Sequence, residues 1–110
     1  AYQEALRTYV RTAIESGANY TIGADGRHGR LPLEMAYLVE LGVSPMDAIH
    51  AATSRAAQAI RAADRVGSLE PGKLADVISV PGDPLQDIGA MANVNLVLKG
   101  GVRCDSLSTN

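Results

Sequence analysis

Residues 2–23 of the chain read YQEALRTYVRTAIESGANYTIG, and this stretch decides the fold class. Over residues 2–16 the apolar side chains recur at helical spacing, with arginines and glutamates elsewhere on the helical wheel. Gly17 follows at the position of a helix C-cap glycine, and residues 18–23 then have the composition of a short buried strand. A helix, a glycine and a strand in this order are typical of a parallel sheet covered by helices. The stretch therefore predicts an α/β fold.

A glycine-rich loop and three helices are predicted after this strand. The loop, GADGRHGR at residues 23–30, carries three glycines and an Asp-Gly pair, which exclude regular structure. The helices are each entered at a proline or a capping residue, and they are predicted over residues 31–41, 44–52 and 55–62.

The composition changes at about residue 67, which divides the chain into two predicted parts. Glu70-Pro71-Gly72-Lys73 is typical of a type II turn, because Pro presets the first central residue and Gly supplies the positive φ of the second. A strand is predicted over residues 75–80, a helical turn over 86–91, and a hairpin of 95–99 and 102–104. We expect residues 1–66 to form an α/β layer, residues 67–104 an antiparallel sheet, and residues 105–110 a frayed polar tail.

Length and charge exclude several classes of protein. With 110 residues, the chain forms at most one domain or a part of a larger one. Its net charge of −2, without a Lys/Arg cluster, excludes the basic surface that nucleic-acid binding needs. One cysteine cannot form an internal disulfide, and the apolar runs are shorter than the roughly 20 residues of a membrane helix. We expect a cytoplasmic protein without nucleic-acid or membrane partners, and, since it begins at Ala1, a trimmed product or an excerpt.

Asp25 is the first candidate site residue, because it follows the predicted strand within a glycine-flanked loop. The carboxyl ends of strands are where α/β barrels and open α/β sheets build their sites. A carboxylate there can ligate a divalent metal or accept a proton from an attacking water. In the alternative interpretation Asp25-Gly26 only makes the turn, since Asp tolerates the left-handed conformation. The local pattern by itself favours the turn.

The chain has few other residues that bind metals or transfer protons. His28 lies in the same loop, as a ligand, a proton donor, a substrate contact or a solvated side chain. His50 lies among alanines in a predicted helix and is interpreted as structural, satisfied by a backbone or neighbouring polar group. Cys104 has no Cys or His partner near it in sequence and is interpreted as inert. These residues cannot assemble a usual zinc site, and no phosphate-binding, dinucleotide-binding or nucleophile-elbow motif occurs. The chain alone therefore carries no complete active site.

Three stretches together resemble the C-terminal part of the metal-dependent amidohydrolase superfamily. They are YTIGADGRHG at residues 20–29, ELGVSPMDAIHAATSRAA at 40–57 and GSLEPGKLADVISV at 67–80. The resemblance covers residues 2–104 and is greatest to the imidazolonepropionase-like and Xaa-Pro dipeptidase-like branch. Members usually read Gly-Thr-Asp-Ala after the last barrel strand, whereas this chain reads Gly23-Ala24-Asp25-Gly26, with Arg27 where a proline is usual.

The resemblance implies the C-terminal part of a (β/α)8 TIM-like barrel followed by strands of a small composite β-sandwich. Residues 1–66 would be the last part of the barrel, and residues 67–104 the C-terminal strands of the sandwich. Asp25 would bind one or two divalent metal ions, with zinc as the default, and would act as the general acid/base; His28 would contact the substrate. The other ligands would belong to about 300 upstream residues, since a barrel alone takes about 250.

Two functions follow as hypotheses. The first is a C-terminal segment of a metal-dependent hydrolase that cleaves C–N bonds by metal-activated water and is inactive without the rest of the enzyme. Its substrate would be an amide, a dipeptide such as Xaa-Pro or a cyclic amide. Its protein partners would be the N-terminal part of the enzyme and a second copy in a homo-oligomer. The alternative is a non-catalytic α/β module that binds a partner or oligomerises, which the incomplete ligand set and a thin, alanine-rich core would suit.

Overall fold

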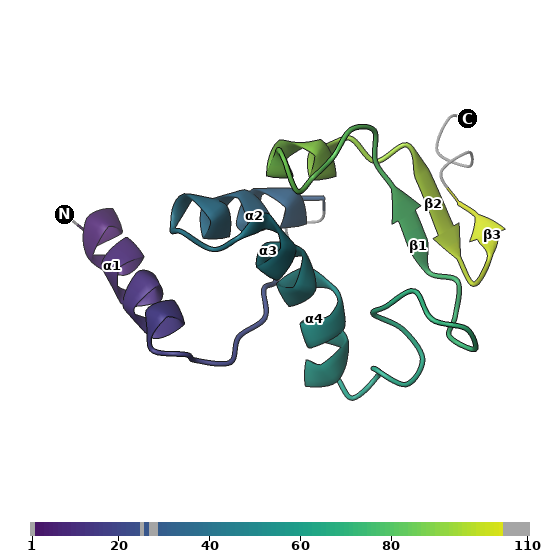
Figure 1. Ribbon diagram of the computed structural model, residues 1–110, viewed down its shortest axis with the longest axis horizontal. Helices are drawn as coiled ribbons and strands as arrows, with labels where there is room; N and C mark the ends of the chain where they lie inside the picture. Colours follow the sequence, from purple (N-terminus) through teal and green to yellow (C-terminus); the bar gives the residue numbers. More distant parts are fainter. Residues whose placement is uncertain (1, 25, 27–28, 105–110) are drawn as a thin grey trace.

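The computed structural model describes residues 2–24, 26 and 29–104. Figure 1 shows helix α1 (Tyr2–Glu15) at one end of the molecule, a small sheet at the other, and three helices between them. These helices are α2 (Leu31–Glu40), α3 (Pro45–Ala52) and α4 (Ser54–Ala59). The sheet contains β1 (Val77–Ser79), β2 (Leu96–Lys99) and β3 (Val102–Arg103), and the short 3-10 helix η1 (Ile88–Ala92) lies between β1 and β2 in the chain.

The helix boundaries follow the capping residues that the sequence provides. The Ser44 side chain accepts a hydrogen bond from the Asp47 N–H at 3.2 Å, so α3 begins at the predicted cap with Pro45 in its first turn. Gly17 has a φ of +86° after α1, and Gly42 has a φ of +103° after α2. Both positive angles are those of glycines that end helices. The predicted starts and stops of these helices are therefore confirmed to within about two residues.

Helix α4 ends three residues earlier than the predicted limit of residue 62. Arg61 adopts a φ of +58°, and the N–H groups of Arg61 and Ala62 donate to the carbonyl oxygens of Gln58 and Ala57. This pair of bonds is a Schellman motif with an arginine in the left-handed position. Because glycine usually occupies that position, no residue at this point in the sequence predicts the end of the helix.

Residues 18–23, predicted as a strand, run without helical turns between α1 and the loop in Figure 1. We call residues 18–24 the extended segment, and it is not part of a sheet among the described residues. The Ala18 N–H donates to the Ala13 carbonyl oxygen at the end of α1. Residues 19–24 form no backbone hydrogen bond with other described residues. A strand is defined by its hydrogen-bonded partners, and the described residues contain none for the backbone of this segment. The prediction is thus corrected to an unpaired extended segment.

The hydrophobic core lies among the central helices. It is formed by buried side chains of α2, α3, η1 and the α2–α3 connection, which are Met35, Leu38, Val43, Ala48, Ala51 and Ile88. Ile14 of α1 and Tyr20 and Ile22 of the extended segment pack against it as half-buried residues. Half of the fully buried apolar residues described are alanines, which contribute little apolar area, so the core is as thin as the composition predicts.

The sheet is antiparallel throughout, in the order β1-β2-β3. Val77 pairs with Leu98, and Leu98 pairs with Arg103 on its other side. Gly100 and Gly101 join β2 to β3 with φ angles of +58° and +83°, which suit the tight turns that match strand twist. The predicted hairpin is confirmed, and so is the type II turn, where Gly72 has a φ of +92° and the Lys73 N–H donates to the Glu70 carbonyl. The second sheet of a composite sandwich is not among the described residues and stays a prediction.

Asp76 ties the tip of this hairpin to the start of β1. Its carboxylate accepts hydrogen bonds from the Lys99 ammonium group and from the Gly100 N–H, both at 2.8 Å. The bond from Lys99 and the bond from Gly100 lower the pKa of Asp76 below its ordinary value of 3.8. The carboxylate is therefore held in its charged form by the fold.

We expect acid to loosen the hairpin through Asp76. Because the pKa is lower in the folded state, the stabilisation is complete above pH 3.8 and is lost as pH falls below it through the folded pKa. The amide resonance of Gly100 in NMR spectra should move with this titration, and the movement should vanish in Asp76→Asn. Asp64→Asn is the matched control, because the Asp64 carboxylate lies 3.8 Å from Arg65 and 80% exposed. A Gly100 resonance that titrates equally in Asp76→Asn would contradict the assignment.

Candidate functional site

The loop at residues 23–30 is the candidate site. Gly26 and Gly29 adopt φ angles of +81° and +82°, where a residue with a Cβ is strained, and both are exposed. Asp25 and His28 lie outside the described residues, as does Arg27. The roles assigned to Asp25 and His28 therefore stay predictions.

Side-chain contacts hold the segment that leads into this loop against the helices. The Tyr20 ring lies beneath the Arg55 guanidinium group, 5.5 Å from its centroid. Arg55 also lies 3.5 Å from the Asp47 carboxylate on the first turn of α3. The Thr21 hydroxyl donates to the Ala51 carbonyl oxygen at 2.5 Å. Sequence reasoning missed Thr21 and Arg55, since residues 30 or more positions apart give no local signal of contact.

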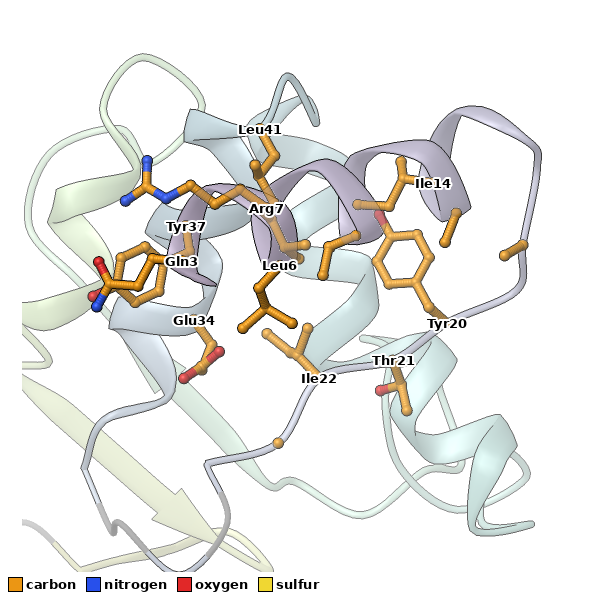
Figure 2. A pocket seen from close by; sticks show the side chains of 15 residues that line it. Gln3, Leu6, Arg7, Ile14, Tyr20, Thr21, Ile22, Glu34, Tyr37 and Leu41 are labelled. Carbon is orange, nitrogen blue, oxygen red and sulfur yellow. The ribbon is translucent and has the colours of Figure 1, made fainter. Parts of the chain in front are cut away.

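A groove of about 640 Å³ lies between α1, the extended segment and α2. Figure 2 shows Leu6 and Ile22 facing each other in its middle, with Tyr20 and Ile14 together at one end. Gln3 and Tyr37 lie at the other end, and Glu34 comes from α2. The lining is mainly aliphatic, with few groups that transfer protons. The groove is therefore a mainly apolar surface, and it does not contain the residues that the sequence assigned to the candidate site.

The described residues do not assemble a metal site by themselves. No group of three or more His, Cys, Asp and Glu side chains lies close enough together to hold an ion within residues 2–24, 26 and 29–104. The carboxylate and imidazole of Asp25 and His28 are of the donor types that zinc prefers. That the chain contributes ligands to an ion whose other ligands lie outside it stays a prediction.

The other titratable residues considered are His50, Cys104 and Glu70. His50 is exposed on α3, and its interpretation as a structural residue stays a prediction. The half-buried Cys104 thiol lies 3.4 Å from the Val102 carbonyl oxygen, and its inertness stays a prediction. The pKa of Glu70 is lowered by hydrogen bonds from Lys73 and Ser68, which lie in the type II turn and just before it, and not in the loop at residues 23–30.

Comparison with known proteins shows which family and which solved structures this chain is similar to. The sequence model of the amidohydrolase family matches residues 4–104. Imidazolonepropionases from Symbiobacterium thermophilum and Brevibacillus brevis are 42% identical over 75 residues and 38% identical over 100 residues, covering 63% and 83% of this chain. A crystal structure of a Xaa-Pro dipeptidase with methionine bound in the active site superimposes with a TM-score of 0.85 at 40% identity over 89% of this chain.

The chain is much shorter than these relatives. It spans 18% and 24% of the two imidazolonepropionases and 25% of the dipeptidase chain. In the described part of the chain, no helix has the length and apolar character needed to cross a membrane.

Proposed function

Because the chain belongs to the amidohydrolase family, we propose that it supplies the last barrel strand and the acid/base carboxylate of a hydrolase that cleaves C–N bonds. Asp25 is the residue that performs this role, at the end of the extended segment 18–24. The match over residues 4–104, which includes that segment, is the observation on which the proposal rests. The rest of the barrel and its other ligands would come from upstream residues.

The unpaired extended segment favours the hypothesis that this chain is part of a larger enzyme over the hypothesis that it is a free-standing module. Residues 19–24 offer backbone donors and acceptors that find no backbone partner among the described residues. These residues are exposed or half-buried, and a row of unpaired backbone groups is a template for pairing, so flanking strands would satisfy them. Tyr20 and Ile22 already pack on the core, which gives the segment the half-buried character of a strand covered by helices.

The proposed chemistry assigns this chain one proton-transfer group. A bound divalent ion, with zinc as our proposal and one or two ions in all, would supply Lewis-acid activation of water and of the scissile carbonyl. Asp25 would hold the ion as one ligand, accept the proton of the attacking water and deliver it to the leaving nitrogen. The small residues on either side, Ala24 and Gly26, leave space for that carboxylate to face a reacting group.

The substrate proposed is a small amide, a Xaa-Pro or other dipeptide, or a cyclic amide. The similarity to imidazolonepropionases and to a Xaa-Pro dipeptidase supports this range. His28 is proposed as a substrate contact. Assembly into a homo-oligomer and a cytoplasmic location remain predictions.

Metal removal tests the proposal in the protein at the full length of its relatives. A chelator is expected to abolish hydrolysis of a panel of dipeptides, N-acyl amino acids and cyclic amides, and added zinc should restore it. Elemental analysis of the untreated protein should find one or two divalent ions per chain. Hydrolysis that survives complete metal removal would contradict the metal-dependent mechanism.

The upstream sequence gives a second test. The resemblance implies a His-x-His segment about 300 residues earlier, at the first strand of the barrel. A full-length sequence without this segment would contradict the proposal. The non-catalytic alternative predicts that the isolated 110-residue chain is a compact, metal-free monomer that melts cooperatively.

A further inference from the structure

The extended segment 18–24 is held by the side chains of three consecutive residues. Tyr20 lies beneath Arg55 of α4, and Thr21 donates to the Ala51 carbonyl at the end of α3. Ile22 packs on the helical core from the opposite side of the segment to Thr21 in Figure 2. These contacts fix the segment in the absence of any backbone pairing among the described residues.

The Ala51 carbonyl is an acceptor that needs a donor from outside its own helix. Ala51 lies in the last turn of α3, where carbonyl groups lose their intrahelical partners. The backbone then turns at Thr53, with φ −122° and ψ −86°, so α4 does not continue the same helix. Ala51 is also fully buried, at 0% exposure, where water cannot serve as the donor. The hydroxyl of Thr21 meets this requirement.

We infer that Thr21 is a positioning residue for Asp25, an inference that rests on the proposed function. Backbone hydrogen bonds to flanking strands do not by themselves specify the register of a strand, so its side chains must set it. A shift by one residue would move every side chain to the opposite face of the sheet. The bond from Thr21 to Ala51 specifies one register, and Asp25 follows four residues later. Thr21 thereby fixes the register of the segment that leads directly into Asp25 in the sequence.

Thr21→Val in the full-length protein tests this role, because valine keeps the shape of threonine and removes the hydroxyl. Misplacement of a reacting group by about 1 Å can cost about 100-fold in rate, so we expect kcat to fall about 10- to 100-fold. KM should change little, because substrate contacts are not altered. Thr21→Ser, which keeps the hydroxyl, should restore kcat. The metal retained per chain after dialysis should fall in Thr21→Val and recover in Thr21→Ser.

Thr53→Val is the matched control. The Thr53 hydroxyl donates to the Ile49 carbonyl at 2.7 Å, so this variant removes the same kind of bond from the same helix at an exposed position away from the segment. Its kcat and metal content should equal those of the parent protein. Thr21→Ala serves as a second variant that introduces no bulk, should Thr21→Val fail to fold, and it should show the same loss of kcat.

The outcomes separate this inference from the proposed function. If Thr21→Val and Thr21→Ala keep the parent kcat while Asp25→Asn abolishes it, the inference is wrong and the proposed function stands. A serine variant as slow as the valine variant also overturns the inference, because the hydroxyl is then not responsible. If Asp25→Asn is fully active, the proposed function itself fails, and the positioning role fails with it.

Discussion

Replacing Asp25 by asparagine in the full-length protein is expected to lower kcat about 1,000-fold, with a smaller change in KM. A positioned general acid/base contributes about 100- to 10,000-fold to a rate, and an amide cannot take that role. The substitution also separates the two interpretations of the loop. Asparagine adopts the left-handed conformation and forms Asx turns as readily as aspartate, so a residue that only made the Asp25-Gly26 turn would tolerate it.

The measurement is a steady-state comparison of Asp25→Asn with the parent protein on the best substrate of the panel, with thermal unfolding of both. Asp83→Asn is the control variant, because the Asp83 carboxylate accepts a hydrogen bond from the Leu85 N–H at 2.9 Å in another loop. It should leave kcat unchanged. If Asp25→Asn keeps kcat within about twofold, the catalytic assignment is wrong, since the expected loss for such a group is at least about 100-fold.

The sequence predicted the elements whose boundaries depend on residues close together in the chain. Ser44 caps α3, Gly17 ends α1, and Gly72 completes the type II turn, because a cap or a turn is decided within four residues. The sequence did not predict the end of α4, where Arg61 takes the left-handed position that glycine usually fills. A residue with a Cβ takes this conformation at a cost of about 1–2 kcal/mol, so local rules do not predict it at an arginine.

The candidate site divides in the same way. The local pattern placed Asp25 after the segment 18–23, and the family resemblance implied its role, which stays a prediction. The match to the amidohydrolase family over residues 4–104 confirms the resemblance. The contacts of that segment could not be predicted, because Thr21 and Ala51 are 30 positions apart and their bond depends on how α3 ends. A buried carbonyl at a helix end can be recognised as an acceptor without a helical partner only when the position of the helix in the fold is known.

Gly67→Ala is expected to cause a larger loss of stability than alanine at any other described glycine, because only here would the new Cβ lie within 3.0 Å of another atom that cannot move aside. Gly67 has a φ of +99°, and a Cβ placed there would lie 2.5 Å from the Ala57 Cβ and 3.1 Å from the Thr53 carbonyl oxygen. Ala57 is buried on α4, so it cannot move aside without disturbing the helix. Backbone strain of about 1–3 kcal/mol and overpacking of about 1–3 kcal/mol together predict a loss of about 4 kcal/mol in the free energy of unfolding.

Gly72→Ala separates the two contributions. Gly72 has a nearly equal φ of +92°, but no atom lies within 4 Å of a Cβ placed there. This variant should therefore show the backbone strain alone, a loss of about 1–2 kcal/mol, in urea unfolding measured beside Gly67→Ala. Equal losses in the two variants would show that Gly67 is required only for its φ, and not for the approach of its backbone to α4. The unequal losses that we expect would mean that the glycine opening the stretch at residues 67–80 joins the sheet region to the helices by direct backbone contact.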